Sequence, residues 1–313
     1  MSAAASRAGP TVEAIPIELG LSAGRGRFGS LTFIAAFELK SSDSRFGGLS
    51  GLAVTGNGER LYAISDRGYW LSASMRHNGE GRLTVLEGWE IGTLLTPEGA
   101  PVSGLQTDAE SLMQDRDGSF IVSFEQEHRL WRYPASAAPF KGPSQTVPTP
   151  RELSQAPNNG GIEALTVLRD GRIFAIAEEY ENPDGTLKAW LMDEDRFAAL
   201  SYFSSAGFRP TDMTTLANGD LLVLERRHSL LGGWGARVQR IARDSVRPGA
   251  RLRGEEIARI VPPLPVDNYE GIAVREKEGG ETFVYLVSDD NYSPLQRTLL
   301  LQFRLDPEGQ KRD

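Results

Sequence analysis

The chain has 313 residues, no cysteine and only three histidines, which excludes disulfide scaffolds, thiolate metal sites and cysteine nucleophiles. Its 34 basic and 42 acidic side chains give a formal net charge of −8, which argues against binding to the phosphate backbone of a nucleic acid. No apolar run is long enough for a membrane-spanning helix.

The N-terminal segment, residues 1–30, is interpreted as an extension in front of the folded domain. Its first residues are small and lack the apolar core of a signal peptide, so they do not form a complete one. Residues 31–39 follow as an apolar, partly aromatic run that predicts a strand. This strand has no evident partner beside it in the sequence.

A strand–turn–strand pattern then recurs five times. The copies start at Ser50, Glu110, Glu163, Asp212 and Glu270, and their second strands end at Asp66, Glu125, Glu178, Glu225 and Asp289. In the first three copies the turn glycine comes eight positions after the starting residue, and in the fourth it comes seven positions after. Asn-Gly and Asp-Gly turns favour tight hairpins, and the flanking residues are β-branched or aromatic, as in half-buried strands.

These copies predict an all-β fold, a single β-propeller over residues 31–306 with a tail at 307–313. They start 49 to 60 residues apart, which leaves room for the four strands of a propeller blade. The last copy ends with residues 298–303 as its third strand. We predict that strand 31–39 pairs with it as the fourth, because this closes the ring and removes an exposed edge. Five blades are predicted; the alternative is six, if residues 10–28 and 134–157 together hide a divergent unit.

The acidic residues at equivalent places in the copies are the candidate site. The innermost strands of a propeller surround a central channel, so equivalent side chains of different blades face one another. Converging carboxylates repel each other and resist desolvation, and they therefore need protons, basic partners or a cation. Calcium fits best, since it takes six to eight oxygen ligands. The predicted calcium ligands are Glu110, Glu163, Asp212 and Glu270; the alternative is that they accept backbone N–H bonds from neighbouring blades.

Several motifs resemble the phytase-like propeller family, labelled "esterase-like activity of phytase". They are Gly48-Leu49-Ser50-Gly51-Leu52, Asp108-Ala109-Glu110-Ser111-Leu112, Gly161-Ile162-Glu163-Ala164-Leu165, Asn268-Tyr269-Glu270-Gly271-Ile272 and Ser65-Asp66-Arg67-Gly68. The resemblance covers roughly residues 46–305. It implies a bacterial protein that is periplasmic or secreted, with an acidic channel mouth and hydrolysis of a phosphate or other ester.

The resulting hypothesis is a metal-dependent hydrolase that takes a small-molecule substrate at the channel mouth. Asp289 or Glu178 would position or deprotonate water, and Arg67 and Arg226 would bind the oxyanion. Ser50 lacks the closing glycine of a G-x-S-x-G nucleophile elbow, which argues against a serine esterase. Two alternatives stay open: a non-enzymatic propeller that binds a ligand or protein in its channel, and a sugar-lactonase-like hydrolase.

Overall fold

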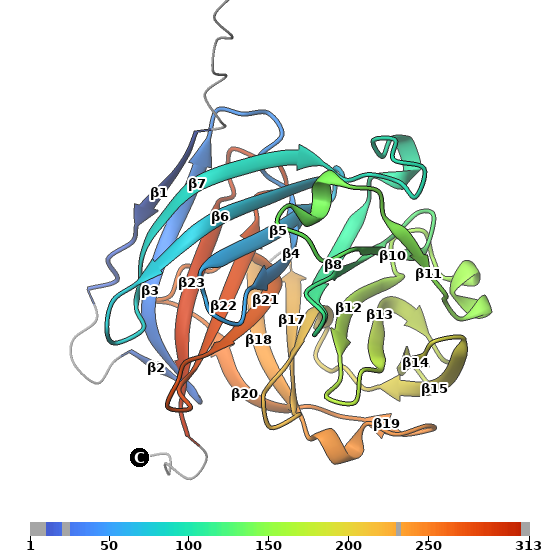
Figure 1. Cartoon of the computed structure of the whole chain (residues 1–313). Helices are drawn as coiled ribbons and strands as arrows, with labels where there is room; N and C mark the ends of the chain where they lie inside the picture. Colours follow the sequence, from blue (N-terminus) through green and yellow to red (C-terminus); the bar gives the residue numbers. More distant parts are fainter. Residues whose placement is uncertain (1–10, 21–25, 230–232, 308–313) are drawn as a thin grey trace, which may run out of the picture.

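The computed structural model arranges five β-sheets in a ring, a five-bladed propeller (Figure 1). It describes residues 11–20, 26–229 and 233–307. Among these residues, no helix is long and apolar enough to cross a membrane. The prediction of five blades is confirmed. The segment 134–157, which the six-blade alternative needed, instead supplies the outer strand of the second blade.

Blades 1 and 2 follow one another along the chain, and each is a sheet of four antiparallel strands. Blade 1 contains β4 (Leu49–Val54), β5 (Arg60–Ser65), β6 (Tyr69–His77) and β7 (Leu83–Thr93). Blade 2 contains β8 (Ala109–Gln114), β9 (Phe120–Phe124), β10 (Arg129–Tyr133) and β11 (Gln145–Val147). Three short 3-10 helices lie in the connections around blade 2: η1 (Gly104–Gln106), η2 (Pro139–Lys141) and η3 (Arg151–Gln155).

Blades 3 and 4 have the same core of four antiparallel strands. Blade 3 contains β12 (Ile162–Val167), β13 (Ile173–Glu181), β14 (Leu187–Asp193) and β15 (Arg196–Tyr202), and β19 (Arg251–Leu252) pairs in parallel with β15. Blade 4 contains β16 (Arg209–Thr215), β17 (Leu221–Ser229), β18 (Gly233–Ile241) and β20 (Glu255–Ile260). The 3-10 helix η4 (Arg243–Ser245) follows β18.

Blade 5 joins the two ends of the chain. It contains β21 (Asn268–Glu276), β22 (Thr282–Asp289), β23 (Thr298–Leu305) and β3 (Leu31–Ser41). β3 runs antiparallel to β23, with Leu39 opposite Thr298 and Leu31 opposite Leu305, and Figure 1 shows blue β3 beside red β23. The predicted ring closure is confirmed. β1 (Val12–Pro16) and β2 (Arg27–Phe28) also pair with β3.

The apolar core consists of five clusters, and each lies between two neighbouring blades. Successive side chains of a strand point to opposite faces of its sheet, so one strand serves two clusters. In β9, for example, Ile121 packs with residues of blade 3, whereas Val122 packs with residues of blade 1. The blades are therefore held together mainly by apolar burial around the ring.

The inner strands β4, β8, β12, β16 and β21 approach each other closely near their starts, where some of them carry glycine. A Cβ added to Gly51 would lie 2.7 Å from the backbone nitrogen of Leu112 in the next blade. We expect Gly51→Ala to lower the free energy of unfolding by about 1–3 kcal/mol through overpacking. Denaturant titration measures this, with Gly56→Ala as the control because its Cβ would meet nothing within 4 Å. Equal stability of the two variants would contradict the close approach.

Candidate functional site

Each inner strand carries a break in its pairing register close to its start, in β4, β8, β12, β16 and β21. Such a bulge leaves a residue out of the ladder and redirects its side chain. The first residues at these breaks are Ser50, Glu110, Glu163, Thr211 and Glu270, and in β8 the break also includes Ser111. The bulges explain how glutamates within strands can gather at one end of the propeller axis.

Blade 4 differs by one residue from the repeat alignment made on sequence. Its bulged residue is Thr211 and not Asp212. Glu225 lies opposite Pro210, the residue just before the bulge, so the next residue of the second strand is Arg226. Arg226 therefore occupies the place that Glu125, Glu178 and Asp289 hold in other blades. A sequence signal for this existed, because Thr211, unlike Asp212, lies eight positions before its turn glycine.

We call the gathered carboxylates the acidic mouth; they are Asp66, Asp108, Glu110, Glu125, Glu163, Glu178, Glu270 and Asp289. Its blade 2 part is a triad of Asp108, Glu110 and Glu125, in which one carboxylate oxygen from each residue lies within 4.8 Å of the other two. Among the described residues, none of these three carboxylates forms an ion pair. Glu125 accepts a hydrogen bond from the Gly161 N–H at 2.5 Å, which fixes one of its oxygens. This is the set of side chains that most resembles a cation site.

A second part of the acidic mouth is organised by Arg226. Its guanidinium forms ion pairs with Glu270 at 2.8 Å and with Glu178 at 3.2 Å. Glu163 lies close enough to Glu178 for a hydrogen bond between them, and its charge and that of Arg226 attract each other. The structure thus brings three predicted residues, Glu163, Glu270 and Glu178, into one group neutralised in part by Arg226.

The third part lies at the end of blade 5. Asp289 is buried and accepts a hydrogen bond from the Asn291 N–H at 2.7 Å. Arg67 is exposed and stacks on the Tyr292 ring, with 3.4 Å from its guanidinium carbon to the ring centroid. No ion pair of Arg67 occurs in the described part of the chain. Arg67 is therefore a cation at the rim that is available to an anionic ligand.

Asp212 lies outside the acidic mouth, in what we call the axial layer: Gly51, Ser111, Ala164, Asp212 and Gly271. Its Oδ1 accepts hydrogen bonds from the Ser111 hydroxyl at 2.8 Å and the Met213 N–H at 2.9 Å. Its Oδ2 accepts one from the Ile272 N–H at 2.8 Å. Because β16 and β8 are not neighbours in the ring, the bond to Ser111 crosses the propeller axis. This arrangement matches the alternative anticipated for these acids, hydrogen bonding between blades.

Desolvation dominates the electrostatics of the acidic mouth. Burial, together with the charges of Glu125, Asp108 and Glu270, raises the pKa of Glu110 well above its usual range. Burial raises the pKa of Glu125 to about 8, that of Glu270 to about 7, that of Asp289 to about 8 and that of Asp66 to about 6. Without a bound cation, the site holds protons near neutral pH.

These pKa values predict how the stability of the metal-free protein changes with pH. Between the unfolded pKa near 4 and the raised folded values, the folded state binds more protons, so the free energy of unfolding falls as pH rises. We expect the melting temperature in a chelator to fall by several degrees through the window of pH 6 to 8. Calorimetry across this window measures it, and Glu125→Gln should flatten the slope. A melting temperature that rises over the same window would contradict the assignment.

The donors of the acidic mouth suit a hard cation. All are oxygens, and the structure leaves two buried acceptors nearby without a hydrogen bond, Asp66 Oδ1 and Asn268 Oδ1. Asn268 adjoins Glu270, and the charges of Asp66 and Asp108 repel each other. Calcium favours such a set of carboxylate and amide oxygens. The residues present therefore fit the predicted ion, with the triad in place of Asp212.

Sequence reasoning missed Asp108 as a site residue. The residues two positions before the bulges are Gly48, Asp108, Gly161, Arg209 and Asn268, with glycine in blades 1 and 3. A Cβ at Gly161 would collide with the His128 ring, and one at Gly48 would collide with the Asp66 carboxylate. Asp108 is the only acid in this series and extends the carboxylate group. Its position two residues before Glu110 was the signal available in the sequence.

Fold and site together define a five-bladed propeller with a carboxylate-lined mouth at one end of its axis. The model of the phytase-like family, described as "Esterase-like activity of phytase", matches residues 44–292. The chain belongs to this family. A comparison with curated proteins finds no match.

Solved structures resemble the chain at low sequence identity. The catalytic domain of a GH62 α-L-arabinofuranosidase from Coprinopsis cinerea is 12% identical, with 88% of this chain and 97% of that chain covered and a TM-score of 0.54. A candidate gluconolactonase is 12% identical, with 93% and 92% covered and a TM-score of 0.46. A streptogramin B lyase is 10% identical, with 94% and 98% covered and a TM-score of 0.39. At these identities the likeness concerns the fold alone.

Proposed function

We propose that the protein is a calcium-dependent hydrolase that acts on a phosphate or other ester at the acidic mouth. The observation that carries the proposal is the triad of Asp108, Glu110 and Glu125, which forms no ion pair among the described residues. Such a group is held together more readily by a cation than by protons at neutral pH. Glu163 and Glu270 adjoin the triad and would complete the oxygen ligands.

When bound, calcium would supply Lewis-acid polarisation of the ester oxygen. Arg67 would pair with the anionic part of the substrate, since it is exposed at the rim and forms no ion pair within the described residues. Arg226 is already tied to Glu178 and Glu270, so in this proposal it neutralises and positions these acids.

Asp289 is the proposed general base. Its pKa of about 8 makes the Asp289 carboxylate a stronger base than an ordinary aspartate once it has lost its own proton, and its Oδ1 is oriented by the Asn291 N–H. Glu178, which is held by Arg226, is the alternative residue for positioning water. A general acid or base typically contributes about 10²–10⁴-fold to a rate.

The test is a hydrolysis assay with and without calcium, after treatment with a chelator. The probes are p-nitrophenyl phosphate, p-nitrophenyl acetate and gluconolactone, which separate phosphatase, carboxylesterase and lactonase activity. We expect calcium-dependent turnover, a loss of about 100-fold or more in Asp289→Asn, and little change in the exposed control Arg76→Gln. Inactivity on all three probes with calcium bound would sink the enzymatic proposal and favour a ligand-binding propeller.

We also propose that the protein works in the periplasm or outside the cell, in keeping with the resemblance noted in its motifs. Calcium sites of extracellular modules need only weak affinity, because the ion is abundant there. A site whose acids hold protons near neutral pH would compete poorly for the scarce calcium of the cytosol. Fractionation of the native host, followed by detection with an antibody, tests this placement.

A further inference from the structure

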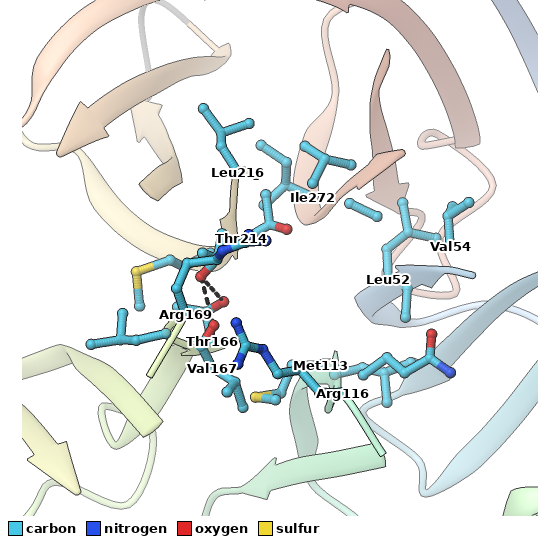
Figure 2. A pocket seen from close by; sticks show the side chains of 18 residues that line it. Leu52, Val54, Met113, Arg116, Thr166, Val167, Arg169, Thr214, Leu216 and Ile272 are labelled. Carbon is cyan, nitrogen blue, oxygen red and sulfur yellow. Dashed lines mark hydrogen bonds between the residues drawn. The ribbon is translucent and has the colours of Figure 1, made fainter. Parts of the chain in front are cut away.

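A pocket lies on the propeller axis, on the other side of the axial layer from the acidic mouth. Its volume is about 230 Å³, and all five inner strands line it (Figure 2). The lining residues follow the axial layer along each strand, as Leu52 follows Gly51 and Leu112 follows Ser111. The side chain of Asp212 and its hydrogen bonds separate this pocket from the carboxylates.

The pocket has the opposite charge to the acidic mouth. Arg116, in the turn after β8, and Arg169, in the turn after β12, both line it, and Figure 2 shows their side chains extending into the space between the inner strands. The residues at the same position of the turns in blades 1 and 4 are Gly56 and Ala217. The cations are thus concentrated on blades 2 and 3.

Neither guanidinium has a partner within the described part of the chain, where no hydrogen bond or ion pair involves it. The acids in the same turns are already engaged: Asp115 pairs with Arg132 at 2.7 Å, and Asp170 pairs with Arg172 at 2.6 Å. Although the chain has a net charge of −8, the acids in these turns leave Arg116 and Arg169 unpaired at the pocket.

The remaining walls limit what the pocket can hold. Thr166 and Thr215 hydrogen bond to each other at 2.9 Å, and Thr215 also donates to the Val167 carbonyl at 2.8 Å, so these hydroxyls are used. Leu52 and Ile272 add apolar surface. The volume lies below the range of about 300–1,000 Å³ that holds drug-sized ligands, which restricts the occupant to a small molecule.

We infer that this pocket, which we call the basic pocket, binds a small organic anion whose carboxylate or phosphate group pairs with Arg116 and Arg169. The guanidinium fork matches either group with two parallel hydrogen bonds. The short body of the ligand lies against the ends of the inner strands. The site is independent of the acidic mouth, because its cations belong to turns at the opposite end of the axis.

Isothermal titration calorimetry with succinate and with inorganic phosphate, at constant ionic strength, tests the basic pocket. The two probes separate a carboxylate ligand from a phosphate ligand, and neutral succinamide is the matched ligand control. We expect saturable binding of at least one anion to one site per chain, with Arg116→Gln and Arg169→Gln each weakening it about tenfold, as the loss of a charge-assisted hydrogen bond does. The exposed control Arg196→Gln should bind as the unmodified protein does.

Two further variants distinguish an anion inside the basic pocket from an anion bound elsewhere on the protein. Thr214→Met keeps both arginines and fills the space, so it should abolish binding if the anion enters the pocket. Glu110→Gln should leave binding unchanged, which shows that the acidic mouth is not involved. Absence of saturable binding of both anions, or wild-type affinity in the double variant Arg116→Gln/Arg169→Gln, would overturn the inference.

Discussion

Glu110→Gln is expected to abolish the stabilisation of the protein by calcium. Glu110 belongs to the triad with Asp108 and Glu125, and burial together with the charges of these neighbours raises its pKa. A neutral amide at this place removes one negative ligand and adds an N–H₂ group that repels the cation. At a calcium concentration 100 times its Kd, wild-type protein should gain about 2.7 kcal/mol of unfolding free energy.

Calorimetry of chelator-treated protein, with calcium added in steps, measures this effect. Without calcium, Glu110→Gln should melt at or above the wild-type temperature at pH 8, because one repulsive ionisation is gone. Glu80→Gln, on the exposed turn after β6, is the control and should keep the full calcium response. A calcium-induced shift of equal size in wild type and Glu110→Gln would show that the triad is not the binding site.

Most of the fold could be predicted because each blade repeats one local pattern. A glycine turn between two strands fixes a hairpin, and the 49 to 60 residues between copies leave room for two more strands. Strand 31–39 has no partner beside it in the sequence, and the last copy has only three strands. The pairing of β3 with β23 could therefore be predicted. An exposed strand edge is prone to pair with other chains, and this pairing removes one.

The candidate site could be predicted only in part, because sequence spacing does not show where a bulge falls. A shift of one residue reverses the direction of a strand side chain. In blade 4, this places Asp212 in the axial layer and directs Glu225 away from the mouth, where it accepts a hydrogen bond from Tyr202 at 3.0 Å. The sequence predicts Arg226 as an oxyanion ligand. Its ion pairs to Glu178 and Glu270 depend on contacts between blades that no local pattern reveals.

Asp212→Ala is expected to lower the free energy of unfolding by about 4 kcal/mol, since each buried donor left without an acceptor costs about 1–3 kcal/mol. Asp212 is fully buried and serves the Ser111 hydroxyl and the N–H groups of Met213 and Ile272. Denaturant titration measures the loss. Asp244→Ala, whose side chain is 91% exposed, should change stability by less than about 0.5 kcal/mol.

The response of Asp212→Ala to calcium separates the two roles that the sequence left open for this residue. A carboxylate that joins blades through the axial layer contributes equally with and without the ion, so the calcium-induced gain in stability should match that of wild type. A ligand would behave as Glu110 is expected to, with the gain lost and little change in the metal-free protein. Asp212→Asn is a useful intermediate variant, because it keeps one acceptor oxygen but turns an N–H₂ group toward the buried donors around it. Its free energy of unfolding should lie between those of wild type and Asp212→Ala. If an Asp212 variant has normal stability without metal but gains no stability from calcium, Asp212 is a calcium ligand.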